Sequence, residues 1–160
     1  MLSDDAVLLR RHSEGVDALA CRKHVYVHAE AAAHQADLPL REEVPDRTGG
    51  WKRRVDIDRA FPQQQVASCR PQVLLFASIV PQSHSTVHPV ESPTALKQLL
   101  THSGPQLFDR ATMRPHLDVL QRLVRHTMSY ALQAGRDLYE EPRTLVHLLR
   151  EAEGAARWPG

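Results

Sequence analysis

Eleven prolines determine where regular secondary structure can form in this chain of 160 residues. Proline has no backbone N–H and disfavours a helical conformation at the residue before it, so long helices and central strands must lie between prolines. Six of the prolines fall between residues 39 and 89, together with a pair of glycines and a run of three glutamines. We therefore expect residues 39–91 to be a loop-rich or partly disordered segment.

Two stretches inside this segment have the composition of short β-strands. Residues 51–58 alternate so that one face of an extended chain would carry Trp51, Arg53, Val55 and Ile57. Residues 73–80 form a continuous apolar run between two prolines, which favours a buried strand over a helix.

The first 38 residues favour helix by composition. Ser3 is a suitable N-cap, and the carboxylates of Asp4 and Asp5 favour the positive end of a helix dipole. Alanine, the best helix former, is frequent after them. Residues 23–28 instead alternate polar and apolar side chains as a strand does. Because helix propensity extends over the longer stretch, we predict a weaker helical N-terminal part over residues 1–38.

Residues 92–157 carry the clearest helix signals. Ser92 and Pro93 provide the cap and the N1 proline of a first helix. Pro115 opens a second, longer helix, and a third follows Thr144. The predicted fold class is therefore mainly α, with a small C-terminal unit of three helices, a weaker helical N-terminal part and short strands in the loop-rich middle.

The composition restricts the core and weakens one functional argument. Phe, Tyr and Trp together number eight, so the core must be built from Leu and Val. Arg outnumbers Lys by 17 to 3, which indicates a GC-rich coding composition. Many of the arginines are then expected at the surface without a binding role.

The long helix, predicted over residues 115–139, has an apolar face. Its residues recur at three- and four-residue steps: Leu117, Leu120, Val124, Met128, Ala131 and Leu138. The flanking helices are each about ten residues long and cannot cover this face at about 1.5 Å per residue. We therefore expect a non-catalytic interaction or assembly protein whose long helix binds a protein partner or a second copy.

Ten histidines raise the alternative of a histidine-dependent metal-binding protein, with zinc as the metal and hydrolysis as its chemistry. Cys21, His24 and His28 would face one ion on a helix. On a strand the two histidines would lie about 13 Å apart, too far for one ion. No His-Glu-x-x-His or paired Cys-x-x-Cys motif occurs, so exposed histidines without a metal are the favoured interpretation.

A second alternative is Arg-mediated nucleic-acid binding. The basic residues that would contact phosphates are Lys52, Arg53, Arg54, Arg122 and Arg125. The formal net charge of +1 lacks the excess that a dedicated nucleic-acid binder carries, so nucleic acid is not the favoured partner. Neither a Gly-x-Ser-x-Gly motif nor a phosphate-binding glycine loop occurs, so an enzyme is not the favoured class either.

The chain has no apolar run of the roughly 20 residues that a membrane-spanning helix needs. The acidic residues that follow Met1 differ from the basic start of a targeting segment. From the sequence we expect a soluble, intracellular protein, cytoplasmic by default and without a membrane partner, in which Cys21 and Cys69 are reduced.

Overall fold

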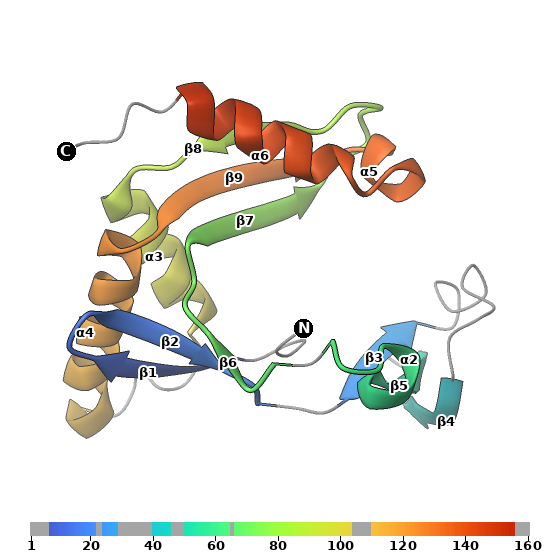
Figure 1. Cartoon of the computed structure of the whole chain (residues 1–160), viewed down its shortest axis with the longest axis horizontal. Helices are drawn as coiled ribbons and strands as arrows, with labels where there is room; N and C mark the ends of the chain where they lie inside the picture. Colours follow the sequence, from blue (N-terminus) through green and yellow to red (C-terminus); the bar gives the residue numbers. More distant parts are fainter. Residues whose placement is uncertain are drawn as a thin grey trace. The chain divides into compact units, whose positions relative to one another are not determined.

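The chain divides between Arg70 and Pro71 into two compact units (Figure 1). The first unit contains two three-stranded sheets and the second contains one. The computed structural model describes residues 7–21, 24–28, 40–45, 50–64, 66–103 and 110–155.

The first sheet of the N-terminal unit has the order β1-β2-β6. β1 (Leu8–His12) and β2 (Gly15–Leu19) form an antiparallel hairpin with a two-residue loop, a length that sets the register of the pair. β2 also pairs with the short β6 (Ser68–Cys69). Val16 and Ala18 alternate along β2 and are buried, so β2 supplies the apolar side of this sheet.

The second sheet of this unit is centred on β5 (Trp51–Asp56). β3 (His24–His28) and β4 (Leu40–Pro45) pair with it on either side, both antiparallel. Val55 is buried, as is the first residue of the short helix α2 (Ile57–Ala60). Burial therefore concentrates at the end of β5, where the chain turns into the helix.

The C-terminal unit has a mixed sheet of order β7-β9-β8. The central β9 (Met128–Ala134) runs parallel to β7 (Val73–Ile79) and antiparallel to β8 (Thr86–Pro89). Parallel strands need a long crossover connection. Here the crossover includes β8 and two helices that pack against each other, α3 (Ser92–His102) and α4 (Arg110–Arg125).

Helix α6 (Thr144–Ala155), which follows the short α5 (Asp137–Glu140), packs on one face of this sheet (Figure 1). It contacts β8. Burial raises the pKa of Tyr130 on β9, and the carboxylate of Glu153 on α6 raises it further. The residues that share this face with Tyr130 are Val73, Leu75, Ala77, Ile79, Val87, Pro89, Met128, Leu132 and Ala134. We call it the α6 face.

The prediction of a mainly α fold is wrong, because strands make up much of both units. In the stretch 1–38, expected to be helical, the described residues form β1, β2 and β3. Helix propensity is a weak preference, and the hairpin pairing of β1 with β2 overrides it. The alternation over residues 23–28 was the better signal. Ser3, Asp4 and Asp5 lie outside the described residues.

The single long helix predicted over residues 115–139 is also wrong. α4 begins before Pro115, contains this proline, and ends at Arg125. The chain then forms β9, which has a partner strand on each side. Leu, Met and Ala at short intervals suit a helix face and a buried central strand equally, so periodicity did not discriminate between them.

Four predicted elements are confirmed. Residues 51–56 and 73–79 form strands, although Ile57 and Asp58, expected in the first of them, begin α2. α3 and α6 begin close to the predicted residues, but the N-cap of α3 is Glu91 and not Ser92, and its side chain makes no cap hydrogen bond. α3 has Pro93 in its first turn, where a missing N–H costs nothing. None of the described helices is long and apolar enough to cross a membrane.

Gly135 follows β9 at a point where the chain has no room for a side chain. A Cβ there would lie 2.8 Å from the carbonyl oxygen of Gln82 and from the carbonyl group of His84. These are backbone atoms and cannot rotate away. We expect Gly135→Ala to lower the free energy of unfolding of the C-terminal unit by about 1–3 kcal/mol, as overpacking does. Urea unfolding followed by circular dichroism measures the change.

Gly154→Ala is the matched control for this prediction. Gly154 lies on α6, and a Cβ there meets no atom within 4 Å. Alanine in an exposed helical position is expected to raise the free energy of unfolding by about 0.5–1 kcal/mol. Equal stability of Gly135→Ala and the wild type would contradict the close approach at Gly135.

Candidate functional site

Strand β7 lies at the edge of its sheet and, among the described residues, pairs with β9 alone. At one end the Gln72 carbonyl accepts a hydrogen bond from the strand beside it, and at the other end the Val80 N–H donates one to it. Backbone groups alternate in direction along a strand, so the even-numbered residues between these two also face β9. The odd-numbered residues point their N–H and C=O groups outward: Val73, Leu75, Ala77 and Ile79. We call these outward groups the β7 edge.

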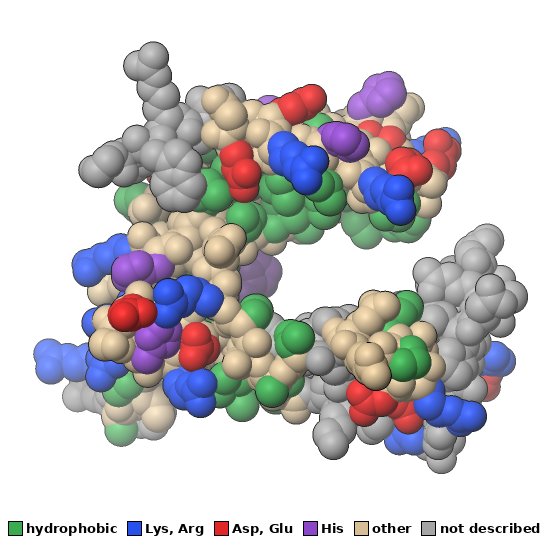
Figure 2. All heavy atoms as spheres, in the orientation of Figure 1, with side chains coloured by type: hydrophobic (Ala, Val, Ile, Leu, Met, Phe, Trp, Pro, Cys, Tyr) green, Lys and Arg blue, Asp and Glu red, His purple; other side chains and the backbone are tan. Residues whose placement is uncertain are grey.

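The β7 edge is uncharged and becomes more exposed along the strand. The first four residues of β7 are half-buried and the last three are exposed, with Ile79 at 78%. Between Arg70 and Glu91 the sequence contains no Lys, Arg, Asp or Glu. Figure 2 shows hydrophobic side chains gathered beneath α6, where Figure 1 draws β9 and β7. Outward backbone groups therefore lie beside apolar surface.

A polar cluster holds the end of β9 against the loop between β7 and β8. The Ser85 N–H donates to Oδ2 of Asp137 (2.8 Å), and the Ser85 hydroxyl donates to Oδ1. The same hydroxyl accepts a hydrogen bond from the Gly135 N–H (2.8 Å). We call these three residues the loop clasp. Both bonds from Ser85 lower the pKa of Asp137 because they stabilise its ionised form, and the bond from the Ser85 side chain has the larger effect.

A serine, a histidine and an aspartate meet at the loop clasp without forming a catalytic triad. In a triad the serine hydroxyl donates to the histidine, which the carboxylate orients. Here the hydroxyl of Ser85 donates directly to Asp137, and Ser85 is only 6% exposed. The His84 side chain is 91% exposed, with its Nδ1 atom 3.9 Å from Asp137 Oδ2. The loop clasp therefore has a structural role, because it joins the loop between β7 and β8 to the segment that follows β9.

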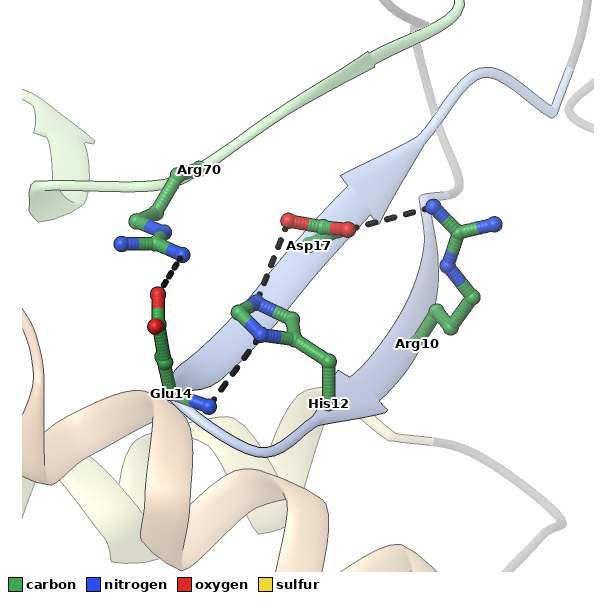
Figure 3. A network of polar contacts seen from close by, with 5 residues as sticks. All are labelled: Arg10, His12, Glu14, Asp17 and Arg70. Atoms are coloured by element: carbon green, nitrogen blue, oxygen red, sulfur yellow. Dashed lines mark hydrogen bonds and ion pairs between the residues drawn. The ribbon is translucent and has the colours of Figure 1, made fainter.

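A second polar network lies on the β1–β2 hairpin (Figure 3). Asp17 pairs with the Arg10 guanidinium (3.1 Å) and with Nε2 of His12 (3.3 Å). The other ring nitrogen of His12 accepts a hydrogen bond from the Glu14 N–H, and the Glu14 carboxylate bonds to Arg70. The backbone therefore engages Nδ1 of His12, while Nε2 lies beside the Asp17 carboxylate. This network ties β1, β2 and the end of β6 together.

The residues predicted to bind a partner are divided among three elements. Leu117, Leu120 and Val124 lie on α4, Met128 and Ala131 on β9, and Leu138 on α5. Leu120 and Val124 are buried, and the two β9 residues point to opposite faces of the sheet. The structure therefore does not bring the six together on one face.

The residues considered for zinc lie at and before a strand. β3 places His24 and His28 at its two ends, about 13 Å apart at 3.3 Å per residue. Cys21 precedes the strand as an exposed free cysteine. Within the described parts of the chain, no group of three or more His, Cys, Asp and Glu is placed to hold a metal ion. The helix that the zinc alternative requires is replaced by β3.

The basic residues considered for nucleic acid lie on two elements: Lys52, Arg53 and Arg54 on β5, and Arg122 and Arg125 on α4. Arg53 points to the opposite side of β5 from its two neighbours and pairs with Glu43 at 2.8 Å. On the face visible in Figure 2, Lys and Arg side chains alternate with Asp and Glu. Acidic side chains therefore lie among the basic ones on the visible surface of each unit.

No protein-family model matches this sequence, and neither a curated protein nor a solved structure matches it. The functional argument therefore starts from the site itself.

Sequence reasoning missed the β7 edge. It predicted the strand, but as a buried one, whereas β7 lies at the edge of its sheet. The sequence carries one signal, the absence of charged residues around an apolar strand. This absence indicates that the strand is covered, but it does not identify the element or partner that covers it. The loop clasp carried no signal, since Ser85 and Asp137 are distant in the sequence.

Asp137→Asn tests the loop clasp. The carboxylate accepts both hydrogen bonds from Ser85, whereas an amide turns its NH₂ group toward one of these donors. The pKa of Asp137 is lowered on folding, so its ionised form stabilises the fold above the ordinary value of 3.8 and this contribution is lost as the pH falls through the folded pKa. We expect the variant to be less stable than the wild type at pH 7, and the gap to narrow below pH 3.8.

Urea unfolding at several pH values measures this gap. Glu151→Gln, which changes an exposed carboxylate on α6, is the control and should alter stability by less than about 0.5 kcal/mol at pH 7. A gap for Asp137→Asn that is independent of pH would contradict the role of the ionised carboxylate.

Proposed function

We propose that this protein binds an extended segment of a protein chain along the β7 edge, so that the segment adds a strand to the C-terminal sheet. The observation that carries the proposal is the row of outward N–H and C=O groups on four alternate residues of an uncharged strand. An extended segment supplies matching donors and acceptors along its whole length. A helix, whose backbone groups are bonded internally, cannot.

The β7 edge lacks the features that usually prevent strand addition. Edge strands are commonly protected by lysines, prolines, bulges or short length. β7 has seven residues, none charged and none proline, and its register with β9 has no shift. The opposite edge of the same sheet differs: β8 is only four residues long and ends in Pro89. One edge of this sheet is therefore protected and the other is not.

The side chains beside the β7 edge favour an apolar partner. On the α6 face the edge residues are Val, Leu, Ala and Ile, and the exposure of Ile79 increases the apolar area that a partner can cover. Side chains directly across two paired strands contact one another. Removing such area from water contributes about 25 cal/mol per Å². We infer a partner segment whose alternate residues are apolar on the α6 face.

This proposal keeps the interaction function expected from the sequence and moves it to another surface. The expected helix face does not exist, because β9 replaces half of that helix and Leu120 and Val124 are buried. The β7 edge offers backbone groups as well as apolar side chains, so it supports binding of a strand.

Ala77→Pro tests strand addition. Proline removes the outward N–H of residue 77, while the bonds to β9 use the even-numbered residues and are kept. Residue 77 is exposed, so the ring is not forced into the core. We expect peptides selected from a random library on the wild-type chain to bind Ala77→Pro at least about fivefold more weakly, the equivalent of one backbone hydrogen bond. Fluorescence anisotropy measures the affinity.

Ala77→Ser is the matched control, because it keeps the N–H and the small side chain. It should bind the selected peptides as the wild type does. The circular dichroism spectrum of Ala77→Pro should match that of the wild type, since the lost N–H has no partner within the sheet of one chain. Equal binding by the wild type and both variants would show that the peptides use another surface.

A further inference from the structure

We infer that the extended segment is β7 of a second copy of this chain, paired antiparallel about a two-fold axis at Phe76. This inference rests on the proposed function, that the β7 edge binds an extended segment. The two three-stranded sheets would join into one continuous sheet of order β8-β9-β7-β7-β9-β8.

The direction of the backbone groups permits this register. In an antiparallel pair, facing residues exchange both hydrogen bonds or neither, so outward residues must face outward residues. With Phe76 opposite its own copy, Leu75 faces Ala77. In the same register Val73 faces Ile79. All four outward residues of each copy then have an outward partner, and the sheet buries no unpaired backbone group along the joint.

The flanking prolines select this register over its neighbours. Pro71 and Pro81 are equally distant from Phe76, one beyond each end of β7. A shift by one step in either direction places one of these prolines opposite an outward residue, Ile79 or Val73. Proline has no N–H to donate, so each shifted register leaves the outward C=O of Ile79 or of Val73 without a hydrogen bond in both copies, whereas the register centred on Phe76 pairs every outward group of β7.

Side-chain size also fits the register centred on Phe76. On the α6 face the half-buried Leu75 meets the small, exposed Ala77. Ile79, at 78% exposed, is covered by the valine at the start of the other strand. On the opposite face the two Phe76 rings meet as a cross-strand aromatic pair, a favourable contact.

Charge favours a second copy as the occupant. The stretch from Pro71 to Val90 has no Lys, Arg, Asp or Glu, so self-pairing brings no like charges together. The same lack of charge gives no electrostatic preference for a different partner. An unprotected edge aggregates unless it is covered, and a second copy is present wherever the chain is made. A two-fold pairing also closes the edge, so it does not propagate into fibres.

Sedimentation velocity of the full chain tests the inference directly. The measurements cover protein concentrations from about 1 to 100 µM. We expect the dimer to dissociate within this range, because two paired strands bury less area than the standard interface of about 1,600 Å². We expect the wild type and Ala77→Ser to dimerise. The Kd of Ala77→Pro should rise about 25-fold, since the two-fold axis removes the hydrogen bond twice and each loss is worth about fivefold. A monomeric wild type, or a variant that dimerises as tightly, would overturn the inference.

Disulfide cross-linking tests the register. The background is Cys21→Ser with Cys69→Ser, which removes both free cysteines, each exposed. Facing residues of a non-hydrogen-bonded pair have Cα atoms about 4.5 Å apart, within the range that a disulfide spans. Phe76→Cys should therefore give a covalent dimer under mild oxidation.

Two further variants keep the register test independent of Phe76. Leu74 faces Ser78 of the other copy in this register, so Leu74→Cys or Ser78→Cys alone should not cross-link, whereas an equimolar mixture of the two should. A covalent dimer from Leu74→Cys alone would overturn the inference.

Peptide binding separates failure of the inference from failure of the proposed function. If the wild type is monomeric but the selected peptides bind it and not Ala77→Pro, the second copy is the wrong partner and the β7 edge still binds an extended segment. If the wild type is monomeric and the peptides bind both proteins equally, both proposals are wrong.

Discussion

The parallel pairing of β7 with β9 is the interaction on which the C-terminal unit depends. Its ladder runs without a break from Val73 opposite Met128 to Ile79 opposite Ala134. Joining strands so far apart in the sequence costs loop-closure entropy, which the burial of central-strand residues such as Tyr130 must offset. Because β7 uses alternate backbone groups for β9, the other alternate groups face outward. The ladder that builds the sheet therefore also creates the candidate site.

The loop clasp decides how firmly the exposed end of this site is held. Ser85 joins the Gly135 N–H and the Asp137 carboxylate, and the lack of a side chain at Gly135 lets the two loops meet. The Arg136 N–H also donates a hydrogen bond to the Gln82 carbonyl, and the Asp137 N–H donates one to the Ser83 carbonyl. A strand edge held in its binding conformation loses less entropy when a partner pairs with it. The clasp would thus lower the entropic cost of the proposed strand addition, while its serine donates to the carboxylate and not to a histidine.

The two edges of the C-terminal sheet explain why a two-fold pairing would complete it. β8 is short and ends in Pro89, so it resists strand addition, whereas β7 is longer and has neither charge nor proline. A sheet formed from two copies would keep a protected β8 at each end. The two unprotected β7 edges would then pair with each other, and β8 would form both outer edges of the joined sheet.

The sequence by itself determined the elements whose limits depend on local chemistry. The prolines around residues 73–79 and Pro93 in the first turn of α3 act within a few residues, so the strand and the helix were predictable. Residues 8–19 and 128–134 have patterns that fit helix and strand alike, and only the strands beside them decided between the two. Whether an uncharged apolar strand is central or lies at an edge depends on how many neighbours it has, which no local pattern encodes. The β7 edge and the loop clasp were therefore decided by tertiary structure, because both consist of groups that long-range pairing brings together or leaves outward.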